Sequence, residues 1–66
     1  MRLHYDEEAD ALYLRLDESQ VEESEEVQSG VILDFNAAGQ VVGVEILRLK
    51  ERLPQANLRQ IQFEIA

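Results

Sequence analysis

The residues with the clearest potential for chemistry are oxygen-bearing side chains spaced like a calcium-binding loop. Positions 1, 3, 6 and 12 of that loop are matched by Asp34, Asn36, Gly39 and Glu45. Position 5 is Ala38, which has no side-chain oxygen, whereas calcium takes about six or more oxygen ligands. The flanking residues alternate in hydrophobicity, as strands do, where a calcium-binding loop requires helices. We therefore expect no metal at this position.

Nucleophilic catalysis has few candidate groups in this chain. His4 is the only histidine, there are no cysteines, and the serines lie in acidic or turn-like segments. No serine has the flanking glycines of a nucleophile elbow, and no glycine-rich phosphate loop occurs. We expect a protein that is not an enzyme, with no catalytic, cofactor-binding or metal-binding residues. Two non-enzymatic functions are given below. A third possibility is a small hydrolase or metal-dependent enzyme that uses Asp34, Glu45 or His4.

The length and the charge limit the classes of function. A chain of 66 residues is expected to form a single domain, residues 1–66, that buries only about 60% of its unfolded surface. Its 14 acidic and 6 basic residues give a net charge of -8, which repels nucleic-acid phosphates and anionic membranes. No apolar run approaches the ~20 residues that span a bilayer, and the N-terminus lacks the apolar core of a signal peptide. We expect a cytoplasmic protein that uses no cofactor and binds neither membranes nor nucleic acid.

Alternating residues predict a β-hairpin at Val31–Leu47. Apolar residues recur at every second position on both sides of the tetrad Asn36–Gly39. Because the side chains of a strand point alternately to its two faces, each half of the hairpin places an apolar row on a core. Asn36 suits the first position of a type I turn, and Gly39 can adopt the left-handed backbone that closes it. Ser29-Gly30 is predicted to be the turn that leads into this hairpin.

The first part of the chain is predicted to form another hairpin. Arg2–Tyr5 alternates, Asp6–Ala9 supplies turn chemistry, and Ala11–Leu16 places three leucines on one face. The last of these segments also fits an amphipathic helix capped by Asp6, since its residues are strong helix formers. Propensity alone does not decide between strand and helix. We favour the strand because three leucines in strict alternation would spread around a helix.

After Leu47 the pattern changes. A short helix is predicted at Arg48–Leu53, where two leucines lie four positions apart, and Pro54 ends it. A second short helical turn is expected at Gln55–Leu58. The chain then finishes with an alternating segment, Gln60–Ile65, that predicts a C-terminal strand with apolar residues Ile61, Phe63 and Ile65. The expected fold class is therefore α+β: a small antiparallel β-sheet, a meander of hairpins, with one short helix before a C-terminal strand.

An acidic segment, Asp17–Glu26, precedes the central hairpin and contains no basic residue. It suits a solvated edge strand, whose charges oppose edge-to-edge aggregation. Because carboxylates can stand in for phosphates, it is also the candidate surface for a basic protein partner. Its six acidic residues are Asp17, Glu18, Glu22, Glu23, Glu25 and Glu26.

Three segments of the sequence resemble a known family. They are Tyr5–Leu14, Gly30–Phe35 and Gly39–Leu47, which contain YDEEADALYL, GVILDF and GQVVGVEIL. Their order and spacing are similar to the signatures of the Domain of Unknown Function 2283 family of small bacterial and archaeal proteins, over residues 3–53. The resemblance implies a compact, mainly antiparallel β domain and supplies no established activity. Members of the family are thought to occur beside small toxin-like proteins, which suggests an antitoxin-like role.

These features together predict a small acidic protein that acts through protein–protein interaction. In one form of this hypothesis the protein is antitoxin-like, and its acidic segment covers a basic toxin-like partner. The alternative is a structural homo-oligomer, in its simplest form a homodimer, that assembles by strand pairing of Ile61, Phe63 and Ile65 with another copy. Affinity capture at low and high salt distinguishes an electrostatic partner from self-association.

Overall fold

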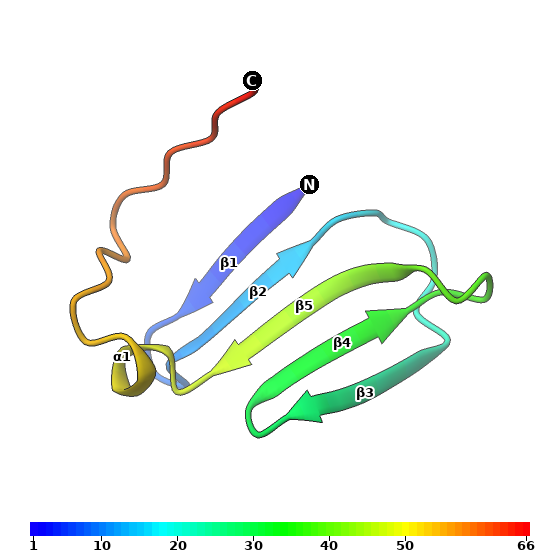
Figure 1. Cartoon of the computed structure of the whole chain (residues 1–66), viewed down its shortest axis with the longest axis horizontal. Coiled ribbons are helices and arrows are strands. Elements are labelled where there is room, and N and C mark those ends of the chain that lie inside the picture. The colour runs from blue at the N-terminus through cyan, green and yellow to red at the C-terminus, as the bar shows by residue number, and fades with distance from the viewer.

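The computed structural model describes residues 1–66 as one five-stranded antiparallel β-sheet with a single turn of helix (Figure 1). The elements in chain order are β1 (Arg2–Asp6), β2 (Ala11–Arg15), β3 (Glu23–Gln28), β4 (Val31–Phe35), β5 (Val41–Leu47) and α1 (Leu49–Arg52). The strands lie in the order β1-β2-β5-β4-β3, so the last strand of the chain is at the centre of the sheet. The predicted antiparallel sheet is confirmed. Because the helix has only 4 residues, the fold is mostly β rather than α+β.

The first hairpin joins β1 to β2, so the segment Ala11–Leu16 is a strand up to Arg15 and not a helix. Its turn is held by the side chain of Asp6, whose Oδ1 accepts hydrogen bonds from the backbone N–H of Glu8 (3.0 Å) and Ala9 (3.2 Å). A short acidic side chain that binds backbone two or three residues ahead favours a turn over a strand or helix. The predicted turn chemistry of this segment is therefore confirmed.

The central hairpin joins β4 to β5 through the predicted turn. Asn36 accepts a hydrogen bond from the N–H of Gly39 (3.0 Å), and its side-chain Oδ1 accepts others from Ala38 (3.1 Å) and Gln40 (3.0 Å). Gly39 has a φ of 77°, the left-handed backbone that closes the turn. Gly30 has a φ of 79° in the turn between β3 and β4. Both turns were predicted at these residues.

Residues 16–22 carry the chain past the end of the sheet, from β2 to the opposite edge at β3 (Figure 1). Arg15 holds this crossing segment by donating hydrogen bonds to the backbone carbonyls of Asp17 (2.7 Å) and Ser19 (2.7 Å). The crossing leaves the central position of the sheet free for β5. Because β5 fills that position, the sheet is not a simple meander of neighbouring hairpins.

The sheet has an apolar face and a polar face. Two apolar rows run across four strands, Leu3–Leu14–Val44–Leu33 and Tyr5–Leu12–Ile46–Val31. These eight residues, together with Phe35 and Val42, form what we call the apolar face. Among the ten, Val42 alone is fully buried, at 1% exposure. Since no second sheet or long helix packs on this face, the core of the molecule is thin.

α1 closes one end of the sheet and is tied to the first hairpin by Asp10. The backbone carbonyl of Asp10 accepts a hydrogen bond from Leu49 N–H (3.0 Å), and both carboxylate oxygens accept from Lys50 N–H (3.0 Å each). The Tyr5 hydroxyl donates to the same carboxylate (2.6 Å). Leu49 is buried at 4% exposure. The helix predicted in this region is confirmed; it lacks the length and apolar character to cross a membrane.

The C-terminal predictions are wrong. Residues 53–66, which we call the C-terminal arm, form neither the helical turn predicted at Gln55–Leu58 nor the strand predicted at Gln60–Ile65. In Figure 1 the arm leaves α1 as irregular chain and ends apart from the sheet. No backbone hydrogen bond joins the arm to a strand. A strand needs such bonds from a neighbour, and an alternating sequence does not by itself provide that neighbour.

Candidate functional site

The acidic segment predicted to bind a partner lies along β3 and the crossing that precedes it. Three of its carboxylates belong to β3 and three to the crossing: Glu23, Glu25 and Glu26, and Asp17, Glu18 and Glu22, respectively. All six residues are exposed. β3 pairs only with β4, so its outer backbone edge is open. The predicted acidic edge strand is confirmed for residues 23–26, whereas residues 17–22 of the segment belong to the crossing.

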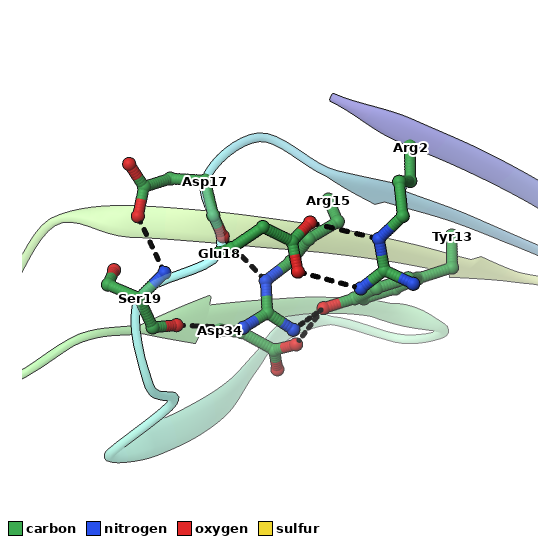
Figure 2. Close-up of polar contacts among 7 residues, drawn as sticks. All are labelled: Arg2, Tyr13, Arg15, Asp17, Glu18, Ser19 and Asp34. Carbon is green, nitrogen blue, oxygen red and sulfur yellow. Dashed lines mark hydrogen bonds and ion pairs between the residues drawn. The ribbon is translucent and has the colours of Figure 1, made fainter.

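Two of the crossing's carboxylates are engaged within the chain (Figure 2). Arg2 donates two hydrogen bonds to Glu18, from Nε (2.9 Å) and Nη2 (3.1 Å), which lowers the pKa of Glu18 below its ordinary value. Asp17 accepts a hydrogen bond from the backbone N–H of Ser19 (2.7 Å). Hydrogen bonds from the Ser19 side chain and backbone lower the pKa of Asp17. Both carboxylates therefore shape the crossing and are not free for a partner.

Of the four remaining carboxylates of the acidic segment, one is engaged within the chain and three are free. Glu26 is engaged, because its Oε2 accepts a hydrogen bond from Gly30 N–H (2.9 Å). Glu22, Glu23 and Glu25 make no side-chain hydrogen bond or ion pair within the chain. They line an open hollow of ≈ 470 Å³ together with Phe35, Asn36, Ala37 and Gly39. We call this feature the acidic hollow. It concentrates negative charge that no cation of the chain balances.

The polar face of the sheet carries a hydrogen-bond network centred on Asp34 (Figure 2). Its carboxylate accepts from the Tyr13 hydroxyl (2.7 Å) and from Ser24 Oγ (2.6 Å). Arg15 lies beside the same hydroxyl, with Nη1 at 3.4 Å from it. Burial, and then the hydrogen bond to Asp34, raise the pKa of Tyr13, which keeps the phenol neutral. The network joins β2, β4 and β3 across β5.

Gly43 makes this network possible. Tyr13 on β2 reaches Asp34 on β4 by passing over β5 at Gly43. A Cβ at Gly43 would lie 2.9 Å from Asp34 Oδ2 and would also clash with the Tyr13 hydroxyl. Sequence analysis missed this network. Two features of the sequence pointed to it. Tyr13 and Arg15 lie on the same face of β2, and a glycine inside a strand often marks a site where another group approaches the backbone closely.

The basic residues of the C-terminal part lie near two different hairpin turns. Arg48 donates to Ser29 Oγ (3.2 Å), and Arg52 donates to the carbonyls of Ser29 and Leu47, at 2.9 Å in the latter case. Arg59 pairs with Glu7 at 3.9 Å, where both side chains are exposed. The arginines therefore brace the β3–β4 turn and contact the β1–β2 turn, and they do not form one continuous basic surface.

Comparison with known proteins identifies the family. A family model described as "Protein of unknown function (DUF2283)" matches residues 2–50. The chain belongs to the DUF2283 family. The match includes all five strands and the beginning of α1, so the resemblance inferred from the sequence is confirmed. Searches of curated proteins and of solved structures found no match.

The carboxylates considered for a metal lie on the polar face of the DUF2283 sheet. Asp34 pairs with Gly43 across the hairpin, and its oxygens accept the two hydrogen bonds described above. Glu45 lies opposite Ile32, and His4 lies opposite Tyr13 on the far side of β2. No group of three or more histidine, aspartate or glutamate residues is arranged to hold a metal ion. The structure thus does not bring His4, Asp34 and Glu45 into one site.

The residues predicted to self-associate lie in the C-terminal arm, outside the DUF2283 match. Ile61, Phe63 and Ile65 are 68%, 70% and 85% exposed, which is high for large apolar side chains. They do not form a strand in the single chain. Their pairing with another copy stays a prediction.

Proposed function

We propose that this DUF2283 protein is a non-enzymatic protein–protein interaction module whose acidic hollow binds a basic surface on another protein. One observation carries the proposal: the side chains of Glu22, Glu23 and Glu25 make no hydrogen bond or ion pair, whereas the other three carboxylates of the segment are engaged. A free, exposed carboxylate can pair with a partner's lysine or arginine without first breaking an internal hydrogen bond. The acidic hollow therefore has the chemistry to receive cationic side chains.

Binding of a basic partner requires a cluster of ion pairs, because a single exposed ion pair is weak. Each exposed ion pair contributes only about 0.2–1 kcal/mol, so three such pairs alone give weak binding. Desolvation of Phe35 within the same hollow adds apolar burial, at about 25 cal/mol per Å². Concentrated negative charge also accelerates encounter with a basic partner at low salt. We expect an association that is fast, of moderate affinity and strongly dependent on salt.

In the finer form of the proposal the protein is antitoxin-like. Its carboxylates then occupy the positions on a basic toxin-like protein that RNA phosphates would take. Support comes from the net charge of -8 and from the occurrence beside small toxin-like proteins that the family resemblance implies. The partner is a protein with a surface rich in lysine or arginine, and the DUF2283 sheet is the rigid scaffold that presents the hollow.

Affinity capture from the native host tests the proposal with two charge-matched variants. The first is Glu22→Gln/Glu23→Gln/Glu25→Gln. The control is Glu8→Gln/Glu51→Gln/Glu64→Gln, which removes the same charge from side chains that make no hydrogen bond or ion pair. We expect the wild type and the control to capture the same basic protein at about 50 mM salt and to lose it at about 500 mM. The first variant should not capture it. Equal capture by the two variants would contradict the proposal.

A further inference from the structure

The molecule exposes more surface than a compact monomer of its size. Its accessible surface is 5224 Å², whereas a folded monomer of 7.6 kDa is expected to expose about 4,300 Å². Its radius of gyration is 12.7 Å against about 11 Å for a compact domain of this length. The excess surface is therefore about 900 Å². The exposed C-terminal arm contributes to this excess together with the sheet, and a standard protein–protein interface buries about 800 Å² on each partner.

The apolar face is the place where a second layer is missing. α1 is a single turn at one end of the sheet. The C-terminal arm covers only one margin, where Leu58 and Ile61 face Leu3, Tyr5 and Leu12 across a hollow of ≈ 390 Å³. The C-terminal arm does not cover the β4–β5 part of the face, whose residues, apart from the buried Val42, remain partly exposed. Domains normally bury the apolar face of a sheet against another layer.

We infer that a second copy of this chain packs its apolar face against this one, so that two sheets form a β-sandwich dimer. Two sheets with the same twist pack face to face at about 30°, which gives an identical copy a matching shape without rearrangement. None of the ten residues of the apolar face is charged, and the charged residues Glu23 and Glu25 lie beside them on the same side of the sheet, at its β3 edge. The inference goes beyond the proposed binding of a basic partner, because its occupant is a second copy that covers the rows of β1, β2, β5 and β4, although the acidic hollow shares Phe35 with this face.

The charge distribution favours an identical copy despite the net charge of -8. The free carboxylates lie at the β3 edge, whereas Lys50 and Arg59 line a hollow beside Tyr5 of β1, at the opposite edge. A two-fold axis parallel to the strands places each β3 edge over the partner's β1 edge. Such a dimer keeps the two acidic edges apart and brings each toward the partner's cations.

The oligomeric state of the full chain tests the inference directly. We expect sedimentation equilibrium at about 100 μM to give 15.2 kDa, twice the chain mass of 7.6 kDa. Leu33→Lys, on β4 in the part of the apolar face that the arm does not cover, should raise the dimer dissociation constant at least about thirtyfold, because it buries a charge in the interface. Ile32→Lys, one residue away on the polar face, is the matched control and should remain a dimer.

A second variant pair removes the risk that Leu33→Lys fails to fold. Leu3 is already 41% exposed on the apolar face, so Leu3→Lys should fold and still weaken the dimer, while His4→Lys on the polar face should not. A 7.6 kDa monomer at all concentrations up to about 1 mM would overturn the inference. So would a dimer that survives both apolar-face variants but is lost on removal of residues 60–66, since strand pairing of the arm would then hold it. A dimer with no bound basic partner would instead leave the inference standing and contradict the proposed function alone.

Discussion

At the scale of single residues, Asp10 joins three parts of the molecule through one carboxylate. The carboxylate accepts hydrogen bonds from the Tyr5 hydroxyl of β1 and from the Lys50 N–H of α1, and Asp10 directly precedes β2. The hydrogen bond from Tyr5, and then the one from the Lys50 backbone, lower the pKa of Asp10. The hydrogen bond to Asp10 is also the largest cause that raises the pKa of Tyr5 to about 12. The two groups therefore stabilise the fold over a limited pH range.

The contribution of each group to the free energy of unfolding depends on pH, with a sign set by the direction of its pKa shift. Asp10 is more acidic in the folded state, so its contribution is complete above its ordinary pKa of about 4 and is lost as pH falls through the lowered value. Tyr5 is less acidic when folded, so its contribution is complete below about pH 10 and is lost as pH rises toward pH 12.

We expect Asp10→Asn to shift the pKa of Tyr5 back toward about 10. Absorbance titration of tyrosinate in a Tyr13→Phe background reports Tyr5 alone; an unchanged pKa near 12 would show that Asp10 is not the cause.

Gly43 is a second residue whose role can be tested by substitution. Gly43→Ala places a Cβ against the Tyr13 hydroxyl and Asp34 Oδ2, so we expect it to lower the free energy of unfolding by about 1–3 kcal/mol. In a Tyr13→Val background the same substitution should cost clearly less, because the side chain that crosses β5 is gone. Urea denaturation of the four proteins in this cycle measures the difference. Equal costs in both backgrounds would mean that Gly43 does not serve the Tyr13–Asp34 contact.

At the scale of elements, the central hairpin depends on the backbone of its turn. No atom lies within 4 Å of a Cβ built on Gly39, so Gly39→Ala tests the positive φ alone. We expect a loss of about 1–2 kcal/mol in the free energy of unfolding from forcing alanine into the left-handed region. Gly39→Asn should lose less, because asparagine tolerates that region better. Thermal or urea denaturation checks the order; alanine equal to glycine would contradict the turn geometry.

The same elements show which features of the fold were available from the sequence. Alternation and turn residues were sufficient for β1, β2, β4, β5 and their turns, because each hairpin is specified locally. The central position of β5 was not predicted, since it depends on the crossing of residues 16–22, which has no local pattern. The prediction of a C-terminal strand was wrong. An alternating sequence indicates that a segment could pair with a sheet edge, but it does not indicate that the segment does pair with one. The free and engaged carboxylates also required the structure, because Arg2 reaches Glu18 from 16 positions away.

At the scale of the whole molecule, the two proposals concern adjoining surfaces of one thin sheet, which meet at Phe35. The apolar face lacks a covering layer and is assigned to a second copy of the chain. The acidic hollow at the β3 edge accounts for the free carboxylates and is assigned to a basic partner. In such a dimer each acidic hollow lies over the partner's β1 edge, so a basic partner and the second copy would compete for the carboxylates of the hollow.

The dissociation constant of the captured basic partner tests the central claim, that the acidic hollow is the binding surface. We expect Glu22→Gln/Glu23→Gln/Glu25→Gln to raise that constant by about tenfold or more at about 50 mM salt, from three lost ion pairs. The charge-matched control Glu8→Gln/Glu51→Gln/Glu64→Gln should change it by less than about threefold. Equal constants for the two variants would contradict the claim, because the partner would then respond to net charge and not to the hollow.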